Sequence, residues 1–195
     1  MSLAALERTP LKYEYLSRFS HSNTGKTEGP VSEGSSTSIS LSGFNAEPSV
    51  IAGFQGCSDD QWANVRFTDV TYNSIGLNIE GSDDFGSEIL GYIAFETSTA
   101  ESSQYLASHT NSRVHEEHYT LKYAYTFDDV PLFFGTVESS GGDDCSVQLQ
   151  SPTSSNTTLY IVETDDFNYY HNNEIIHYVA MEDGTKIYTN GYVEF

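Results

Sequence analysis

Basic residues are scarce in this sequence. Its 195 residues contain eight Lys and Arg against 28 Asp and Glu, which gives a net charge of −20 at pH 7. Proteins that bind DNA or RNA draw most of their affinity from Lys and Arg side chains that neutralise phosphates. Adhesion to anionic lipid depends on basic residues in the same way. We therefore expect no nucleic-acid partner and no attachment to anionic membranes.

Cysteine, long apolar runs and a secretion signal are also missing. Two cysteines are too few for a disulfide framework. No apolar stretch approaches the ~20 residues of a membrane-spanning helix, so we expect no membrane insertion. Residues 1–10 lack a basic segment followed by an apolar core, which predicts a chain without a signal peptide.

The acidic surplus is combined with only four lysines and with many Ser and Thr in place of long aliphatic side chains. This combination is typical of proteins from extreme halophiles, in which a dense carboxylate surface keeps the protein hydrated and soluble. An ordinary acidic surface protein is the alternative.

An internal repeat divides the sequence into two similar stretches. Each copy has a Phe four positions before a Pro that opens an apolar run, and each ends in a Glu-x₃-Tyr-(Ile/Val)-Ala-x-Glu block. Self-similarity of this kind marks a duplicated structural unit. The aligned segments are Phe44–Ala52 with Phe127–Gly135, Val65–Phe85 with Val147–Phe167, and Glu88–Glu96 with Glu174–Glu182.

Segments within each copy alternate apolar and polar residues, which predicts strands with one buried and one solvated face. The alternation is nearly strict in Thr37–Ser42 and in His118–Tyr125. Clusters of Gly, Asp and Ser separate these segments as turns. Short strands at regular spacing predict a β-sandwich or barrel. Residues 2–8 form the one helix candidate, so we expect very little helix.

We therefore expect an all-β protein built from two tandem antiparallel β-sandwich modules. Each module is under about 90 residues, a size at which a single core is only marginally stable alone. The modules should consequently support each other or rely on an assembly. The expected organisation is an N-terminal arm (1–12), a first module (13–97), a linker (98–104), a second module (105–183) and a C-terminal tail (184–195).

The order of features in each copy resembles the H-type lectin domain and its relatives, which are small antiparallel β-sandwiches. That order is Phe-x₃-Pro, a Gly/Asp loop, Val-x-(Phe/Leu), Leu-x-Ile, an acidic loop and the closing Glu-x₃-Tyr block. The resemblance covers each copy almost end to end. It implies the sandwich fold, a sugar-binding surface and an oligomer, with a trimer as the implied form. The loops do not match the family's sugar-contacting positions, so none of those is transferred.

The acidic loop of the second copy is the expected ligand-binding surface. Loop carboxylates can hold Ca²⁺, but their spacing matches no calcium loop, and Asp in turns hydrogen-bonds its own backbone. We therefore expect no metal and no cofactor. Four additional residues make this loop rich in aromatics, which can stack on sugars, anchor a protein contact or pack on the other module. The predicted contact residues are Asp165, Asp166, Tyr169, Tyr170, His171 and Glu174.

No constellation of residues predicts an enzyme. His115-Glu-Glu-His118 lacks the zincin spacing, and the sequence has no Cys-x-x-Cys, no Gly-x-Ser-x-Gly and no phosphate-binding glycine loop. Cys57 and Cys145 stand nine and fourteen residues after the Pro of their copies. Because these positions are not equivalent, the module does not require them, and we expect two free thiols.

We expect a structural protein on the exterior of a halophilic virus particle, as a capsid decoration, turret or tail component. A lectin-like sandwich usually faces outward, and a virion protein assembled in the host cytoplasm reaches the outside without a signal peptide. The expected partners are further copies in a symmetric oligomer, other virion proteins and host-surface glycans. A free carbohydrate-binding lectin is the alternative, and a glycoside hydrolase is a remote one.

Overall fold

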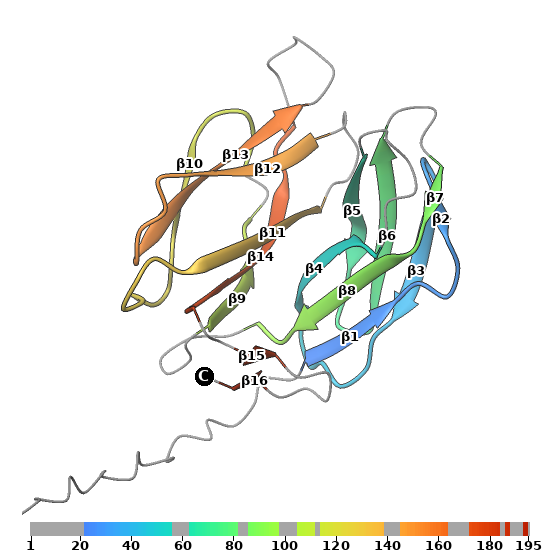
Figure 1. Cartoon of the computed structure of the whole chain (residues 1–195), viewed down its shortest axis with the longest axis horizontal. Coiled ribbons are helices and arrows are strands. Elements are labelled where there is room, and N and C mark those ends of the chain that lie inside the picture. The colour runs from blue at the N-terminus through green and yellow to red at the C-terminus, as the bar shows by residue number, and fades with distance from the viewer. Residues whose placement is uncertain are drawn as a thin grey trace, which may run out of the picture.

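The computed structural model describes residues 22–55, 63–81, 86–97, 105–111, 114–138, 145–163, 172–183, 186–187 and 193–194. Every regular element in these ranges is a β-strand, which confirms the all-β prediction (Figure 1). The described part of the chain holds no helix of the length and hydropathy needed to cross a membrane.

The first half of the chain forms one three-stranded antiparallel sheet, a second set of three antiparallel strands that belongs to a larger sheet described below, and one short strand pair. The first inner sheet consists of β1 (Ser22–Lys26), β8 (Leu90–Phe95) and β4 (Ser49–Phe54), in that order. The first outer sheet consists of β3 (Ser36–Ser40), β6 (Ser74–Gly81) and β5 (Ala63–Val70). The short pair consists of β2 (Val31–Ser32) and β7 (Ser87–Glu88).

The second half repeats this arrangement. The second inner sheet consists of β9 (Tyr105–His109), β14 (Ile175–Met181) and β11 (Leu132–Glu138). The second outer sheet consists of β10 (Tyr119–Lys122), β13 (Asn156–Glu163) and β12 (Cys145–Gln150). Near the C-terminus, β15 (Lys186–Ile187) pairs with β16 (Val193–Glu194).

The two halves pair their strands in the same register. When two residues are partners across neighbouring strands in one half, the residues that the sequence repeat aligns with them are partners in the other half. The superposition of residues 13–97 on 105–183 as two modules stays a prediction. Matched register pairs are Ala52–Tyr92 with Gly135–Tyr178 in the inner sheets, and Val65–Ile79 with Val147–Ile161 in the outer sheets.

Three apolar clusters hold the sheets together. One fills the first half and includes Phe67 and Leu77, and one fills the second half and includes Leu159. The third cluster joins the halves, because it lies between the two inner sheets and contains Phe95 and Val179. The four sheets therefore stack in the order first outer, first inner, second inner, second outer.

A parallel contact between β5 and β11 connects the halves a second time. Phe67 and Glu138 are partners there, which fuses the first outer and second inner sheets into one six-stranded sheet, β3-β6-β5-β11-β14-β9. The two faces of the first inner sheet pack on the two parts of this six-stranded sheet. The large sheet therefore folds around the β4 edge of the first inner sheet.

Equivalent core positions should contribute similarly to stability. Leu77 and Leu159 are both fully buried and occupy matched places in β6 and β13. Leu77→Ala and Leu159→Ala should each lower the free energy of unfolding by about 2–5 kcal/mol, because each leaves a cavity in a closed core. Chemical denaturation measures this, with the exposed Leu149→Ala as the control. A much smaller loss at one of the two sites would contradict the equivalence.

Candidate functional site at the junction of the two halves

The edge of β4 lies against the second inner sheet and is held there by hydrogen bonds. The Ser49 hydroxyl lies 2.9 Å from the carbonyl oxygens of both Ser108 and Tyr178. The Val50 N–H donates to Nδ1 of His177 at 3.4 Å, and the Ala52 N–H donates to Oγ1 of Thr136 at 3.3 Å. Side chains of β14 and β11 thus satisfy backbone groups that a strand edge would otherwise leave open.

His177 is the central residue of this contact and is fully buried. Since its Nδ1 accepts the Val50 N–H, the neutral ring carries its proton on Nε2. Nε2 in turn lies 2.7 Å from Oε2 of Glu138 and donates to it. The ring also meets Phe67 edge to face at 5.5 Å and stacks on His109 at 5.4 Å. Nδ1 and the contact with Phe67 therefore join the halves, whereas Glu138 and His109 hold the ring from within the second half.

A metal ion is the other chemistry that this cluster suggests. Glu47, Glu138 and His177 each offer a ligand atom, and these atoms lie within 4.8 Å of one another. Nε2 of His109 lies 3.5 Å from Oε1 of Glu47. Imidazole and carboxylate together suit a zinc ion. A metal on Nε2 of His177 would, however, place the proton on Nδ1, where it would face the Val50 N–H. The hydrogen bonds therefore favour a metal-free polar cluster.

A buried ion-pair network forms the second polar contact across the junction. Arg66 of β5 is 1% exposed. Its Nη1 pairs with Glu80 of β6, and its Nη2 lies 3.1 Å from Oε1 of Glu174. Glu174 is 2% exposed and bridges to Val114 of the second half. One guanidinium between two carboxylates thus ties the first outer sheet to the start of β14.

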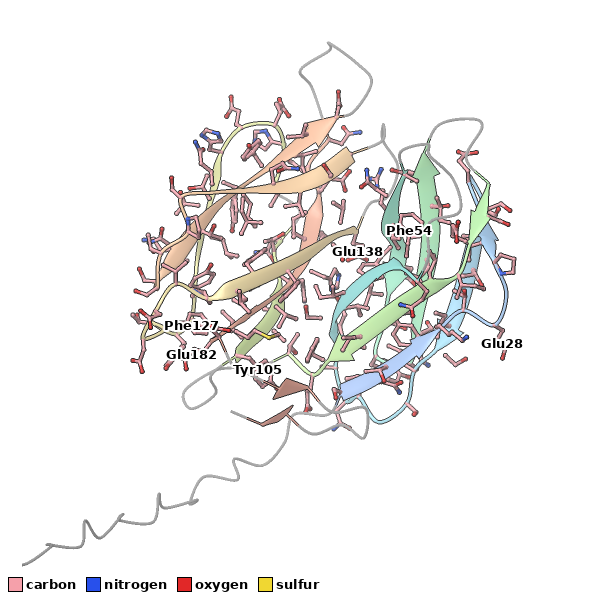
Figure 2. The ribbon with its side chains drawn as sticks, in the orientation of Figure 1. Glu28, Phe54, Tyr105, Phe127, Glu138 and Glu182 are labelled. Carbon is pink, nitrogen blue, oxygen red and sulfur yellow. The ribbon has the colours of Figure 1, made fainter. Side chains whose placement is uncertain are left out.

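A small cavity, the junction hollow, lies where four strands of the two halves meet. Its volume is about 310 Å³, and Figure 2 labels Phe54 and Glu138 on the β4 and β11 sides of the junction. The lining comes from aligned positions of both copies, with Phe54, Asn64, Thr136 and Ser146 providing an aromatic ring and polar groups. The lining residues are Ala52–Phe54, Ala63–Val65, Gly135–Val137 and Cys145–Val147.

Of the predicted ligand-binding residues, the structure places one. Glu174 lies inside the protein, where its carboxylate binds Arg66 rather than facing a ligand in solvent. The predicted contact with a ligand stays a prediction for the other five, which fall outside the described residues. They are Asp165, Asp166, Tyr169, Tyr170 and His171.

Arg66, Glu138 and His177 were missed by reasoning from the sequence. A usable signal was present, because the two copies differ at these aligned positions. His177 stands where the first copy has Gly91, and Glu138 stands where it has Gln55. Differences between copies that keep the same strands mark positions where the copies meet different neighbours.

Cys145 is a free, fully buried thiol at the edge of the junction hollow. Its burial raises the pKa of the thiol to about 12, with nearby Glu174 and Glu80 adding to the rise and Arg66 opposing it. The aligned residue of the first copy is Ala63, so the thiol is not needed by the strand itself. Cys57 lies outside the described residues.

Comparison with protein-family models, with curated proteins and with solved structures finds no match for this chain.

Removing Arg66 should unfold the junction. Arg66→Met leaves the buried Glu174 carboxylate and the partly exposed Glu80 carboxylate without this cation, so the free energy of unfolding should fall by about 3–5 kcal/mol. The triple variant Arg66→Met/Glu80→Gln/Glu174→Gln removes the charges as well and should recover most of this loss. Urea denaturation of the three proteins tests the network. Equal stability of Arg66→Met and wild type would show that the network does not hold the halves together.

The buried thiol should make the protein sensitive to alkali. A thiol with an ordinary pKa near 9.0 ionises when the chain unfolds, whereas folded Cys145 stays protonated to about 12. Stability should therefore fall as pH rises above about 9, because the unfolded state binds fewer protons there. Tyr105 and Tyr123, whose burial also raises the pKa to about 12, add to the loss above pH 10.

Cys145→Ala, which copies the first half, should flatten the part of this decline that begins near pH 9. Urea denaturation of wild type and variant at stepped pH measures it. An unchanged decline in the variant would assign the alkaline loss to other groups.

Proposed function

We propose that this protein is a non-enzymatic structural protein that works within an assembly on the exterior of a halophilic virus particle, as a capsid decoration, turret or tail component. The observation that carries the assembly role is an apolar strip on and just before β11. Val130 is 55% exposed, Leu132 48% and Phe134 47%. Large apolar side chains grouped on one exposed edge mark a surface that another protein covers.

The charge of the chain supports a salty setting for this assembly. Copies with a net charge of −20 repel one another in dilute buffer. Salt screens surface charges within a Debye length of about 3 Å at 1 M, whereas burial of apolar side chains keeps its strength. An acidic protein with an exposed apolar strip is therefore suited to associate in concentrated salt and to stay dispersed in dilute buffer.

Carbohydrate binding is the second candidate, and the junction hollow favours it. Phe54, Asn64 and Ser146 are among the residues that line the hollow, so an aromatic residue and two polar residues meet there. An aromatic face with converging hydrogen-bonding groups is a common way to hold a sugar. On a particle surface the same hollow would contact host glycans, whereas on a free protein it would make the chain a lectin.

The virion assignment is tested on purified particles from the host that produces this chain. We expect the chain to band with intact particles in a density gradient, and to be removed by protease before the genome becomes accessible to nuclease. A chain that remains among the free proteins of the gradient would overturn the assignment. A glycan array on the same free protein, with Asn64→Leu as the variant, would then establish whether it is a lectin.

A further inference from the structure

The surface that receives the β4 edge within the chain has a counterpart in the first inner sheet, and this counterpart is unfilled. The β4 seat, the surface of the second inner sheet that holds the β4 edge, is formed by Ser108, Tyr178, His177 and Thr136. Strand registers give the counterparts of these four residues in the first inner sheet. They are, in the same order, Gly25, Tyr92, Gly91 and Gly53.

All four counterparts line a second hollow, which we call the open seat. Its volume is about 610 Å³, and Ile51 and Ile93 provide its apolar floor. Glycine replaces the side chains of His177 and Thr136 there, and the space next to Gly53 is open to an approaching backbone. A Cβ on Gly91 would overlap the amide of Gln55, so this amide lies near the place that the His177 ring takes in the β4 seat and offers a polar group to an incoming strand edge.

The apolar strip is, in turn, the counterpart of the part of β4 that docks. Val130, Leu132 and Phe134 align with Glu47, Ser49 and Ile51. Ser49 is fully buried and Ile51 belongs to the apolar cluster at the junction, whereas the strip is exposed. Among the described residues, β11 pairs with β5 only at Glu138, so the β11 edge beside Leu132 and Phe134 forms no ladder with β5.

We propose that the β11 edge of one molecule docks into the open seat of a second copy of this chain, as β4 docks into the β4 seat within the chain. The proposal rests on the assembly role above and specifies its partner. The strip and the open seat are different surfaces of one molecule, so the contact is head to tail. Such contacts generate a closed ring or a filament, depending on whether the rotation closes.

Charge complementarity supports the same pairing. Lys26 lines the open seat and holds the position of His109, which contacts Glu47 in the β4 seat. Asp128 and Asp129 are exposed and directly precede Val130 of the strip. Docking therefore brings one of the four lysines of the chain to two carboxylates of the second copy.

Substitution of Gly53 by Glu blocks the seat without disturbing the chain that carries it. No atom lies within 4 Å of a Cβ built on Gly53, so a larger side chain fits without a clash at a position that lines both the open seat and the junction hollow. Gly29→Glu is the matched control, because Gly29 also faces open space but lies in the turn after β1, outside the seat.

The strip is removed by Leu132→Thr/Phe134→Thr, which keeps β-forming residues on β11. The control is Leu149→Thr/Val162→Thr, since these two exposed side chains belong to the second outer sheet.

Sedimentation velocity in molar KCl measures the association. Wild type and both controls should form oligomers, whereas Gly53→Glu and Leu132→Thr/Phe134→Thr should each sediment as monomers with wild-type melting temperatures. An equal mixture of these two variants should form dimers that grow no further, because each variant brings one intact surface. Dilute buffer should disperse the wild-type oligomers.

A monomeric wild type in molar KCl at every concentration would overturn the docking, as would a mixture that forms no dimer. Association that appears only after deletion of residues 1–21 would assign the open seat to a segment within those residues and overturn the docking as well. If Leu132→Thr/Phe134→Thr does not fold, the comparison of Gly53→Glu with Gly29→Glu still tests whether association needs the open seat. If the chain forms oligomers in solution but is missing from purified particles, the virion assignment is wrong and the docking still holds.

Discussion

The edge of β4 that pairs with no other strand in the described part of the chain determines how the two halves are arranged. A strand edge exposes N–H groups that must find partners when they are covered by protein. Here the partners are side chains, since Nδ1 of His177 and Oγ1 of Thr136 accept the Val50 and Ala52 N–H groups. The six-stranded sheet folds around this edge, and the apolar cluster between the inner sheets fills the remaining contact.

Differences between the two copies at aligned positions account for one filled seat and one open seat in the same chain. The two copies keep the same strand registers, so the aligned residues occupy the same places in their sheets. His177 and Thr136 in one copy are Gly91 and Gly53 in the other. The second inner sheet is thereby closed by the first half, whereas the first inner sheet keeps the surface that we propose receives the β11 edge of a second copy. The proposed assembly role rests on this asymmetry rather than on the sandwich fold.

Much of the strand framework could be predicted from the sequence, and the junction could not. Alternation and the repeat identified the segments that became β6 and β13, and Leu77 and Leu159 lie in their cores as the pattern indicates. The alternation of apolar and polar residues along a strand predicts which side chains are buried, but it does not predict which other strand they pack against. Glu174 was therefore expected in a ligand-binding loop, although its partner Arg66 lies 108 residues away. The β5–β11 pairing likewise has no counterpart within one copy, so the repeat could not indicate it.

Native-state hydrogen exchange at the Val50 and Ala52 amides tests the central claim, that side chains of the second half close the β4 edge. The account predicts that both amides exchange only on global unfolding, as slowly as amides of the neighbouring β8, and that His177→Ala accelerates exchange at Val50 more than at Ala52. Rapid exchange of both amides in the wild-type protein, at the rate of an exposed strand edge, would contradict it.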